Sequence, residues 1–257
     1  MGMSNDIIVI KCGGSVITEL SAQFFKALHE LQKRGKKVVI VHGGGPVINQ
    51  LLSRMNIRVE FVDGLRKTTK DVLDVVEMTL AGKVNKQFVT NLSQYGLKAV
   101  GLSGCDGQML LVKPIEFGKL GYVGEVDHVN VDLLITLLND DYIPVVAPIG
   151  MSSQGGKYNI NADSAAGSIA EALNAKQLLF VTDVPGILQN GILLEEASEN
   201  QINDMISDGT IYGGMIPKVK AAIHSLSDKL QEVMIVSGKN SILSASGSLY
   251  GTKIRKL

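Results

Sequence analysis

Residues Lys37–Gly45 read KVVIVHGGG, an apolar stretch that leads directly into three consecutive glycines. A second apolar stretch, Ile7–Lys11, ends in the same way, at Cys12-Gly13-Gly14. Because glycine has no side chain, its backbone N–H can approach an anion closely, and a following helix adds the positive end of its dipole. The two turns therefore predict a crevice lined by backbone donors and by Lys11, which indicates phosphate chemistry.

The composition is that of an ordinary globular protein. Of the 257 residues, 45% are hydrophobic and 19% are charged, and 25 basic side chains balance 25 acidic ones. This balance gives no reason to expect binding to nucleic acid or to a membrane surface. No apolar run reaches the roughly 18 residues that a bilayer-spanning helix needs, and the first residues, MGMSND, do not resemble a signal peptide. Cys12 and Cys105 form neither a disulfide framework nor a metal-ligand pattern, so we expect a cytoplasmic protein.

Apolar, β-branched stretches alternate with amphipathic ones along almost the whole chain. The predicted strands are Ile7–Lys11, Lys37–His42, Ala99–Leu102, Ile143–Ala147, Gln177–Thr182 and Gln231–Val236. The predicted helices are Ala22–Arg34, Pro46–Met55, Lys70–Leu92, Val131–Asn139 and Ala162–Leu173. Strands that are hydrophobic on both faces and alternate with helices predict an α/β fold with a mainly parallel sheet covered by helices.

The segment Gln108–Asp127 has a different pattern. Its short β-like pieces, LLVKP and GYVGEV, are separated by Gly118 and Gly121, which predicts an antiparallel hairpin added to the main sheet. No linker, internal repeat or low-complexity tract divides the chain, so we expect one compact unit.

Two lysines stand beside glycine-rich turns. Neither the usual P-loop nor the dinucleotide-binding fingerprint occurs, so phosphate must be bound in another way. Lys11 ends the first predicted strand, where its ammonium can project into the crevice outside the carboxyl ends of the strands. Lys218 follows Gly213 and Gly214 in the first turn of a predicted helix, where its charge opposes the helix dipole. A bound anion would compensate for this unfavourable placement.

Asp163 lies in the segment YNINADSAA, which has two amides and a carboxylate at alternating positions. Asn161 or Asp163 can cap the helix that follows. A carboxylate near two lysines would also keep both ammonium groups charged and aimed.

Three further residues are weaker candidates. Arg66, in DGLRKT, can make a forked contact with a carboxylate, although most loop arginines are simply solvated. Thr182 and Asp183 offer a polar rim for a nucleoside, although a plain turn has a similar sequence. His42 is a candidate catalytic residue, but its place on an apolar strand favours a hydrogen-bonded structural histidine.

Seven motifs, taken in order, resemble those of the amino acid kinase family: KCGG, VVIVHGGG, DGLRKT, NINAD, VTDVPGIL, GGMIPK and GTKI. They extend from Lys11 to Ile254. The resemblance implies a three-layer αβα sandwich, with an amino-acid-binding lobe at about residues 1–175 and a nucleotide-binding lobe at 176–257. GLRKT and NINAD favour the members that phosphorylate the side-chain carboxylate of N-acetyl-L-glutamate, the second step of arginine biosynthesis.

The same resemblance implies roles for individual residues. Lys11 would contact the transferring phosphoryl group, Lys218 would contact the nucleotide phosphates, and Asp163 would orient both lysines. Mg²⁺ would arrive as Mg-ATP, held mainly by phosphates and water rather than by protein ligands. The expected substrate-binding residues are Gly44, Gly45, Arg66 and Asn159, and the expected nucleotide-binding residues are Gly13, Gly14, Thr182 and Asp183.

The chemistry implied by the resemblance agrees with the residues present. A carboxylate nucleophile is already ionised at neutral pH, so the reaction needs no general base. Catalysis then consists of aligning two anions and neutralising their charge, which lysines, glycine N–H groups and Mg²⁺ can do.

Two alternative functions stay open, and the oligomeric state is a separate expectation. One is a related kinase that acts on a carrier-linked aminoadipate derivative, and the other is an inactive nucleotide-binding regulator. We expect a homodimer whose interface includes the helix around Asp71–Leu92. An arginine-regulated hexamer is not expected, because in ring-forming relatives an extra N-terminal helix links the dimers and only ten residues precede Lys11 here.

Overall fold

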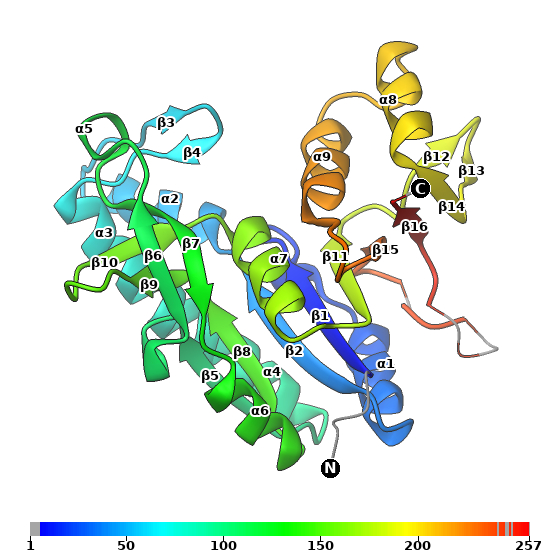
Figure 1. The fold of residues 1–257 in the computed structure, drawn as a ribbon, viewed down its shortest axis with the longest axis horizontal. Helices are drawn as coiled ribbons and strands as arrows, with labels where there is room; N and C mark the ends of the chain where they lie inside the picture. The colour runs from blue at the N-terminus through cyan, green and yellow to red at the C-terminus, as the bar shows by residue number, and fades with distance from the viewer. Residues whose placement is uncertain (1–5, 241, 245–246, 248, 257) are drawn as a thin grey trace.

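The computed structural model describes residues 6–240, 242–244, 247 and 249–256 (Figure 1). The start of the chain, on which the expectation of no signal peptide rests, lies outside these residues except for Asp6. Within them, no helix is long and apolar enough to cross a membrane.

The core of the protein is an eight-stranded sheet in the order β14-β16-β15-β11-β1-β2-β8-β5. The run from β15 to β5 is parallel, whereas β16 is antiparallel to β15 and pairs in parallel with β14. The strands are β1 (Ile7–Cys12), β2 (Lys37–His42), β5 (Ala99–Ser103), β8 (Ile143–Ala147), β11 (Gln177–Thr182), β14 (Glu196–Ser198), β15 (Glu232–Ser237) and β16 (Thr252–Arg255).

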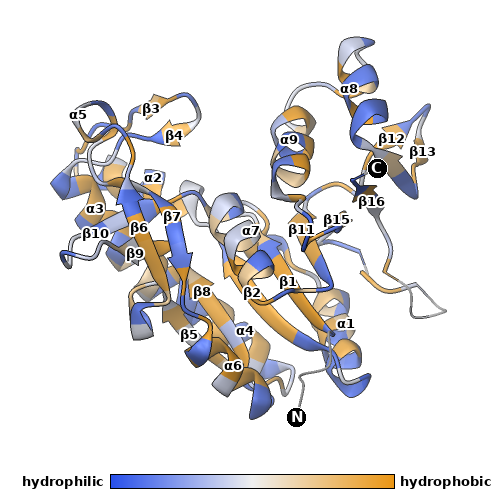
Figure 2. Cartoon of the chain, viewed as in Figure 1, coloured by the Kyte–Doolittle hydropathy of each residue, from blue (hydrophilic) through white to orange (hydrophobic). Residues whose placement is uncertain are grey.

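Helices cover both faces of this sheet, which confirms the expected three-layer fold (Figure 1). Alternate residues of β1 point to opposite faces: Ile8 and Ile10 pack with one cluster of buried side chains, and Ile7 and Val9 pack with the other. The first face is covered by α1 (Ala22–Lys33) and α4 (Asn85–Gln94), and the second by α6 (Asp132–Asn139), α7 (Ala162–Ala172), α8 (Glu199–Ser207) and α9 (Met215–Ser225). Figure 2 shows the central strands as the most hydrophobic part of the fold.

The predicted antiparallel hairpin is present, but its place in the fold was predicted wrongly. Strands β6 (Leu110–Pro114) and β7 (Val123–Val129) pair with one another and not with the central sheet. With β9 (Ile149–Met151) and β10 (Lys157–Ile160) they close a small barrel of their own. The pairing partners lie far away in the sequence, so the local pattern of Gln108–Asp127 could not identify them.

The predicted continuous helix Lys70–Leu92 is also wrong in its middle. Regular α-helix occurs in α3 (Lys70–Glu77) and α4, but the intervening segment η2 (Met78–Val84) is a π-helix. Thr79 Oγ1 donates to Val75 O at 2.6 Å, a bond to the carbonyl four residues back that bends helices.

The remaining elements are short, except for the ten-residue helix α2. Two small hairpins are formed by β3 with β4 and by β12 with β13. Their bounds, with those of the remaining helices, are β3 (Phe61–Val62), β4 (Leu65–Arg66), β12 (Leu188–Gln189), β13 (Ile192–Leu193), α2 (Gly45–Arg54), α5 (Phe117–Leu120), η1 (Ile17–Glu19) and η3 (Asp106–Gln108).

The central sheet brings the predicted site together because β1, β2 and β11 are neighbouring parallel strands. Their carboxyl ends therefore share one edge, where Lys11, His42 and Thr182 lie on adjacent strands. The expected boundary between the two lobes lies between residues 175 and 176. Because β1 precedes this boundary, β11 follows it and the two strands pair, both lobes would share one sheet, and the division stays a prediction.

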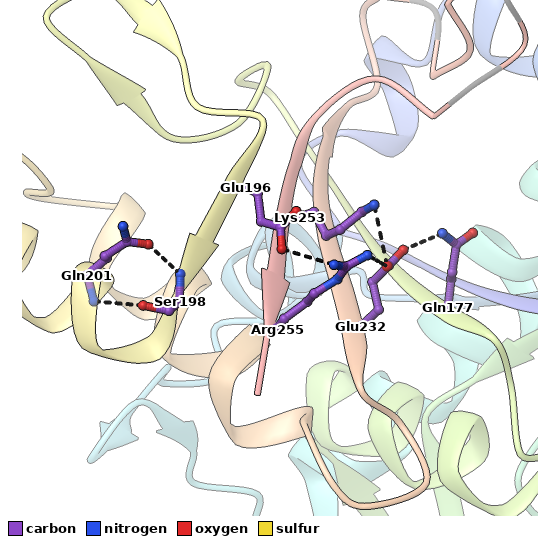
Figure 3. A network of polar contacts seen from close by, with 7 residues as sticks. All are labelled: Gln177, Glu196, Ser198, Gln201, Glu232, Lys253 and Arg255. Atoms are coloured by element: carbon purple, nitrogen blue, oxygen red, sulfur yellow. Dashed lines mark hydrogen bonds and ion pairs between the residues drawn. The ribbon is translucent and has the colours of Figure 1, made fainter. Parts of the chain in front are cut away.

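At the opposite edge, a network of polar side chains joins four strands (Figure 3). Glu232 accepts a hydrogen bond from Gln177 at 2.5 Å and pairs with Arg255 at 3.1 Å. Arg255 also pairs with Glu196 at 3.1 Å. This edge borders a hollow of about 760 Å³. Its charged residues are largely engaged with one another, so we attribute to them a role in strand pairing.

Candidate active site

A hollow of about 340 Å³ lies at the carboxyl edge of the central sheet, and we call it the central crevice. Nine predicted site residues line it: Lys11, Gly13, Gly14, Gly44, Gly45, Asp163, Thr182, Asp183 and Lys218. The sequence thus identified residues from five separate parts of the chain that the fold brings together. Arg66 and Asn159 are not part of this lining and lie in a group beside it.

The first glycine turn (Gly13–Gly14) and the second glycine turn (Gly43–Gly45) approach one another too closely to hold side chains. A Cβ on Gly14 would lie 2.6 Å from the backbone nitrogen of Gly44 and 2.8 Å from that of Gly45. The turns are joined by a hydrogen bond from Gly43 N–H to Cys12 O at 2.9 Å. No described residue accepts a hydrogen bond from the N–H of Gly44 or Gly45, so these donors are available to a ligand.

Each of the two lysines in the crevice is paired with a carboxylate. Lys11 Nζ lies 2.7 Å from Asp163 Oδ1, and Lys218 Nζ lies 2.7 Å from Asp183 Oδ1. The hydrogen bond from Lys218 holds the pKa of Asp183 below its usual value. We expected Asp163 to hold both lysines, but here it pairs with Lys11, and Lys218 pairs with Asp183.

Asp163 is placed by the cap of α7. Asn161 Oδ1 accepts hydrogen bonds from Asp163 N–H at 2.8 Å and from Ser164 N–H at 3.2 Å, so Asn161 is the N-cap residue. Of the two caps that the sequence allowed, it is therefore Asn161 that caps the helix. Asp163 stands in the first turn, where the helix dipole favours a negative charge, and is free to face Lys11.

Arg66 ends β4 and is almost fully buried beside the second glycine turn. Its Nη2 donates to Asn49 Oδ1 at 2.7 Å and contacts Gly45 O at 3.5 Å, and Phe61 lies 4.8 Å from the guanidinium carbon. Its Nη1 is buried and has no hydrogen-bond acceptor among the described residues. Because a buried donor without a partner is unfavourable, this nitrogen is suited to a ligand carboxylate.

Asn159 is connected to Arg66 through Thr68. Asn159 Nδ2 donates to Thr68 Oγ1 at 3.2 Å, and Thr68 Oγ1 donates to Arg66 O at 2.8 Å. The sequence analysis did not identify Thr68 or Asn49. Thr68 lies within the GLRKT motif, which was the available signal, whereas nothing in the sequence indicated Asn49.

A second hollow, of about 680 Å³, adjoins the central crevice and shares Asp183 and Lys218 with it. Its other lining includes Leu188, Thr210 and Tyr212. Tyr212 is 76% exposed and Leu188 is 42% exposed, so apolar surface is open to solvent here. This part of the site was not predicted, because in VTDVPGIL only Thr182 and Asp183 have side chains that indicate a polar site.

Comparison with known proteins agrees with this geometry. The sequence profile described as the Amino acid kinase family matches residues 6–237. The chain belongs to the amino acid kinase family. The predicted family and the predicted fold are therefore confirmed.

Relatives within the amino acid kinase family cover almost the whole chain. The chain is 59% identical to an acetylglutamate kinase from Geobacillus sp. (strain WCH70), over 96% of each chain. It is 51% identical to an acetylglutamate kinase from Halalkalibacterium halodurans, over 98% of this chain and 96% of the relative. Among solved structures, smu.665 from Streptococcus mutans UA159 is 35% identical, with a TM-score of 0.85, over 98% of this chain and 99% of that chain.

Proposed function

We propose that this member of the amino acid kinase family transfers the γ-phosphoryl group of ATP to the side-chain carboxylate of N-acetyl-L-glutamate, giving an acyl phosphate and ADP. The observation that carries the proposal is the central crevice, where two lysines and the free N–H groups of a glycine turn converge. The names of relatives that are 50–59% identical support this choice of reaction and substrate.

The amino-acid substrate would lie between the second glycine turn and the group around Arg66. Its reacting carboxylate would accept hydrogen bonds from Gly44 and Gly45 N–H, which have no acceptor among the described residues. The free Nη1 of Arg66 would bind the α-carboxylate, and Asn159 would bind the acetamido group or the α-carboxylate side. A buried guanidinium binds a carboxylate with both charge and direction.

The nucleotide would extend from the central crevice into the second hollow. Gly13 and Gly14 would donate to its phosphates, Gly13 in place of its 3.5 Å hydrogen bond to Val181 O. Lys218 would neutralise the phosphates, and Thr182 and Asp183 would border the nucleoside. Tyr212 offers an exposed aromatic face in the second hollow, which suits a flat heterocyclic base.

The side chains present fit phosphoryl transfer without a general base. A carboxylate is ionised at neutral pH, so the protein has only to align the two reactants and stabilise the charge that builds up. Lys11 would lie over the transferring group and Lys218 over the nucleotide phosphates. Asp163 would keep the Lys11 ammonium aimed, at the 2.7 Å distance found here.

Mg²⁺ would enter bound to ATP and would supply further neutralisation of phosphate charge. Within the described part of the chain, no three His, Cys, Asp or Glu side chains form a group that could hold a metal ion. An ion that keeps phosphate and water ligands, as Mg²⁺ commonly does, would need few ligands from the protein.

For the assembly we propose a homodimer that buries the helical segment around Asp71–Leu92. Met78, in this segment, is 58% exposed, so an apolar side chain is available there for contact with a partner. Light scattering of the purified protein tests this proposal, and a mass equal to one chain would contradict it.

The reaction is tested by ADP release with Mg-ATP and a panel of acceptors, with hydroxylamine present to trap acyl phosphate. The acceptors are N-acetyl-L-glutamate, glutamate, N-acetylaspartate, carbamate and UMP. We expect a hydroxamate with N-acetyl-L-glutamate only. ADP release with a different acceptor would keep phosphoryl transfer but overturn the roles of Arg66 and Asn159. Inactivity with the whole panel would favour the alternative that the protein is an inactive nucleotide-binding regulator.

A further inference from the structure

A fully buried polar pair stands directly behind the second glycine turn. His42 is the last residue of β2 and Asn85 is the first residue of α4, and both side chains are completely buried. Asn85 Nδ2 lies 3.2 Å from His42 Nε2, and His42 Nδ1 lies 2.9 Å from Gly43 O. His42 does not line the central crevice, so its role is not that of a general base in contact with substrate.

The hydrogen-bond partners fix the orientation of the Asn85 amide. Its Nδ2 donates to Val145 O at 2.8 Å and to Leu102 O at 3.2 Å, and its Oδ1 accepts from Lys86 Nζ at 3.1 Å. A carbonyl can only accept and an ammonium can only donate, so the amide cannot be turned the other way. Its NH₂ group therefore faces His42 Nε2.

The hydrogen-bond partners also fix the tautomer of His42. Gly43 O can only accept, so Nδ1 carries the proton and donates it to this carbonyl. Nε2 faces the NH₂ group of Asn85, which cannot accept a hydrogen bond, so Nε2 is the unprotonated nitrogen and shares the two amide protons with Val145 O and Leu102 O. Burial also lowers the pKa of His42 to about 4, which keeps the ring neutral at physiological pH.

The bond to Gly43 O also determines where the next N–H points. A trans peptide is planar, with the carbonyl oxygen and the following N–H on opposite sides. Holding Gly43 O toward His42 therefore aims the N–H of Gly44 away from the imidazole. The nitrogen of Gly44 lies 2.6 Å from the position of a Cβ on Gly14, so this peptide edge faces the other glycine turn.

The π-helical segment η2 supports the turn from the same side. A Cβ on Gly44 would lie 2.5 Å from Leu80 Cδ2 and 3.4 Å from Val84 Cγ2, so η2 packs directly against Gly44. The segment ends at Val84, immediately before Asn85. Irregular turns of this kind often occur at functional sites, and here one precedes the buried amide that contacts His42.

We propose that His42 and Asn85 are positioning residues, which hold the Gly43–Gly44 peptide so that its N–H is aimed at the reacting carboxylate. This inference rests on the proposed function, because it assigns that N–H to the phosphoryl acceptor. Neither side chain touches substrate. They act through the backbone of the turn, by way of the neutral Nδ1–H tautomer.

Two substitutions at one position separate this role from simple packing. In His42→Asn the side-chain amide can reach the place of Nδ1 and still donate to Gly43 O. In His42→Gln the amide extends instead to the place of Nε2, facing Asn85, and leaves Gly43 O without its donor. Both variants lose the ring, so a role limited to filling space predicts similar losses.

We expect kcat to fall at least about 30-fold in His42→Gln and no more than about 5-fold in His42→Asn, because a misaimed donor loses much of its effect on the transition state. The KM for ATP should change little in either variant. His128→Gln, at an exposed position of β7, is the matched control and should behave as the wild type. Equal losses of kcat in the two His42 variants, or wild-type kcat in both, would overturn the proposal.

A second measurement uses the wild-type protein and does not depend on activity or on the folding of a variant. Long-range ¹H–¹⁵N correlation spectra of the imidazole at pH 7 should show a protonated Nδ1 and an unprotonated Nε2. A protonated Nε2 would overturn the inference. If the acceptor panel identifies another substrate, the proposed function fails. The proposal for His42 and Asn85 is then still decided by the tautomer of His42 and by the ratio of kcat between the two His42 variants with that substrate.

Discussion

The ammonium of Lys11, near the end of β1, lies 2.7 Å from Asp163 Oδ1 in the first turn of α7. The lysine side chain is 16% exposed, so it is largely withdrawn from solvent but open to the central crevice. An ammonium held in this way can meet a phosphoryl group without reorganisation, which is the arrangement that stabilises transition-state charge most effectively.

Removal of this ammonium should slow the chemical step. We expect Lys11→Ala to lower kcat by about 10²–10³-fold, by analogy with the loss of one preorganised donor. Steady-state kinetics with saturating Mg-ATP and N-acetyl-L-glutamate measure this effect. Lys26→Ala, on the exposed side of α1, is the matched control. A folded Lys11→Ala protein with nearly normal kcat would show that the lysine is not in the reaction path.

Lys218 should act on the nucleotide side of the same crevice. We expect Lys218→Ala to lower kcat by about 10²–10³-fold as well, because the phosphate charge loses a partner. Asp183→Asn keeps the size of the side chain that faces Lys218 but removes its charge, so its effect on kcat should be smaller. If only the KM for the amino acid changed in Lys218→Ala, Lys218 would belong to the substrate side.

Arg66 should determine affinity for the amino acid. We expect Arg66→Ala to raise the KM for N-acetyl-L-glutamate by at least about 10-fold, since a buried charge-assisted contact contributes about 1.5–3 kcal/mol. Arg66→Lys should recover little of this loss, because an ammonium cannot make the forked contact. The KM for ATP, measured in the same assays, should stay near normal. A change confined to ATP would contradict the placement of Arg66.

The strands of the core were predictable because they are hydrophobic on both faces. Lys37–His42, Ile143–Ala147 and Gln177–Thr182 have in the structure the bounds that the sequence predicts. A strand buried between two helical layers has a signal within its own few residues. The hairpin at Gln108–Asp127 has a local signal too, but its barrel depends on β9 and β10, and no pattern within the hairpin specifies them.

The candidate site likewise has residues that a local sequence signal predicts and contacts that depend on distant segments. Glycine turns and the nearby Lys11 are visible in the sequence because they combine a strand end with a conformational requirement. The pairing of Lys218 with Asp183 and the contact between Asn159 and Thr68 depend on how distant segments meet. The π-helical turns of η2 were missed for a similar reason, since the periodicity of Lys70–Leu92 suits an ordinary helix and the departure accompanies packing against Gly44.

The network around Glu232 should contribute to stability rather than to activity. Burial raises the pKa of Glu232, but hydrogen bonds from Gln177 and Arg255 outweigh this and lower it overall. A lowered pKa means that the stabilisation is present above the unfolded value, about 4.5, and is lost as the pH falls through the folded value. We expect Glu232→Gln to lower the free energy of unfolding at pH 7 by about 1–2 kcal/mol, with a smaller difference near pH 4.

Glu196→Gln is the comparison for that measurement. Glu196 pairs with the same Arg255, but its side chain is 53% exposed, so its loss should lower the free energy of unfolding by at most about 1 kcal/mol. Denaturant titrations at the two pH values measure both variants. An equal effect of the two substitutions would mean that the lower exposure of Glu232, 17%, contributes nothing.

His42 should give the protein a characteristic loss of stability in mild acid. Burial is the main cause that lowers its pKa to about 4; Lys86 lowers it further, and the bond to Gly43 O raises it. In the unfolded chain the imidazole takes up its proton near pH 6.5, at about its ordinary pKa. Between these values the unfolded chain binds one more proton, so stability is complete above about pH 6.5 and is lost as the pH falls toward 4.

Comparison with His42→Asn isolates this effect, because every other titrating group is common to both proteins. Among the neighbours, the Cys12 thiol stays protonated in this range, because burial raises its pKa to about 12. Between pH 7 and 4.5 the wild type should lose about 2–3 kcal/mol more free energy of unfolding than His42→Asn. Parallel pH profiles from chemical denaturation would mean that His42 becomes protonated in the folded protein, and that the neutral ring is not required to hold the glycine turn.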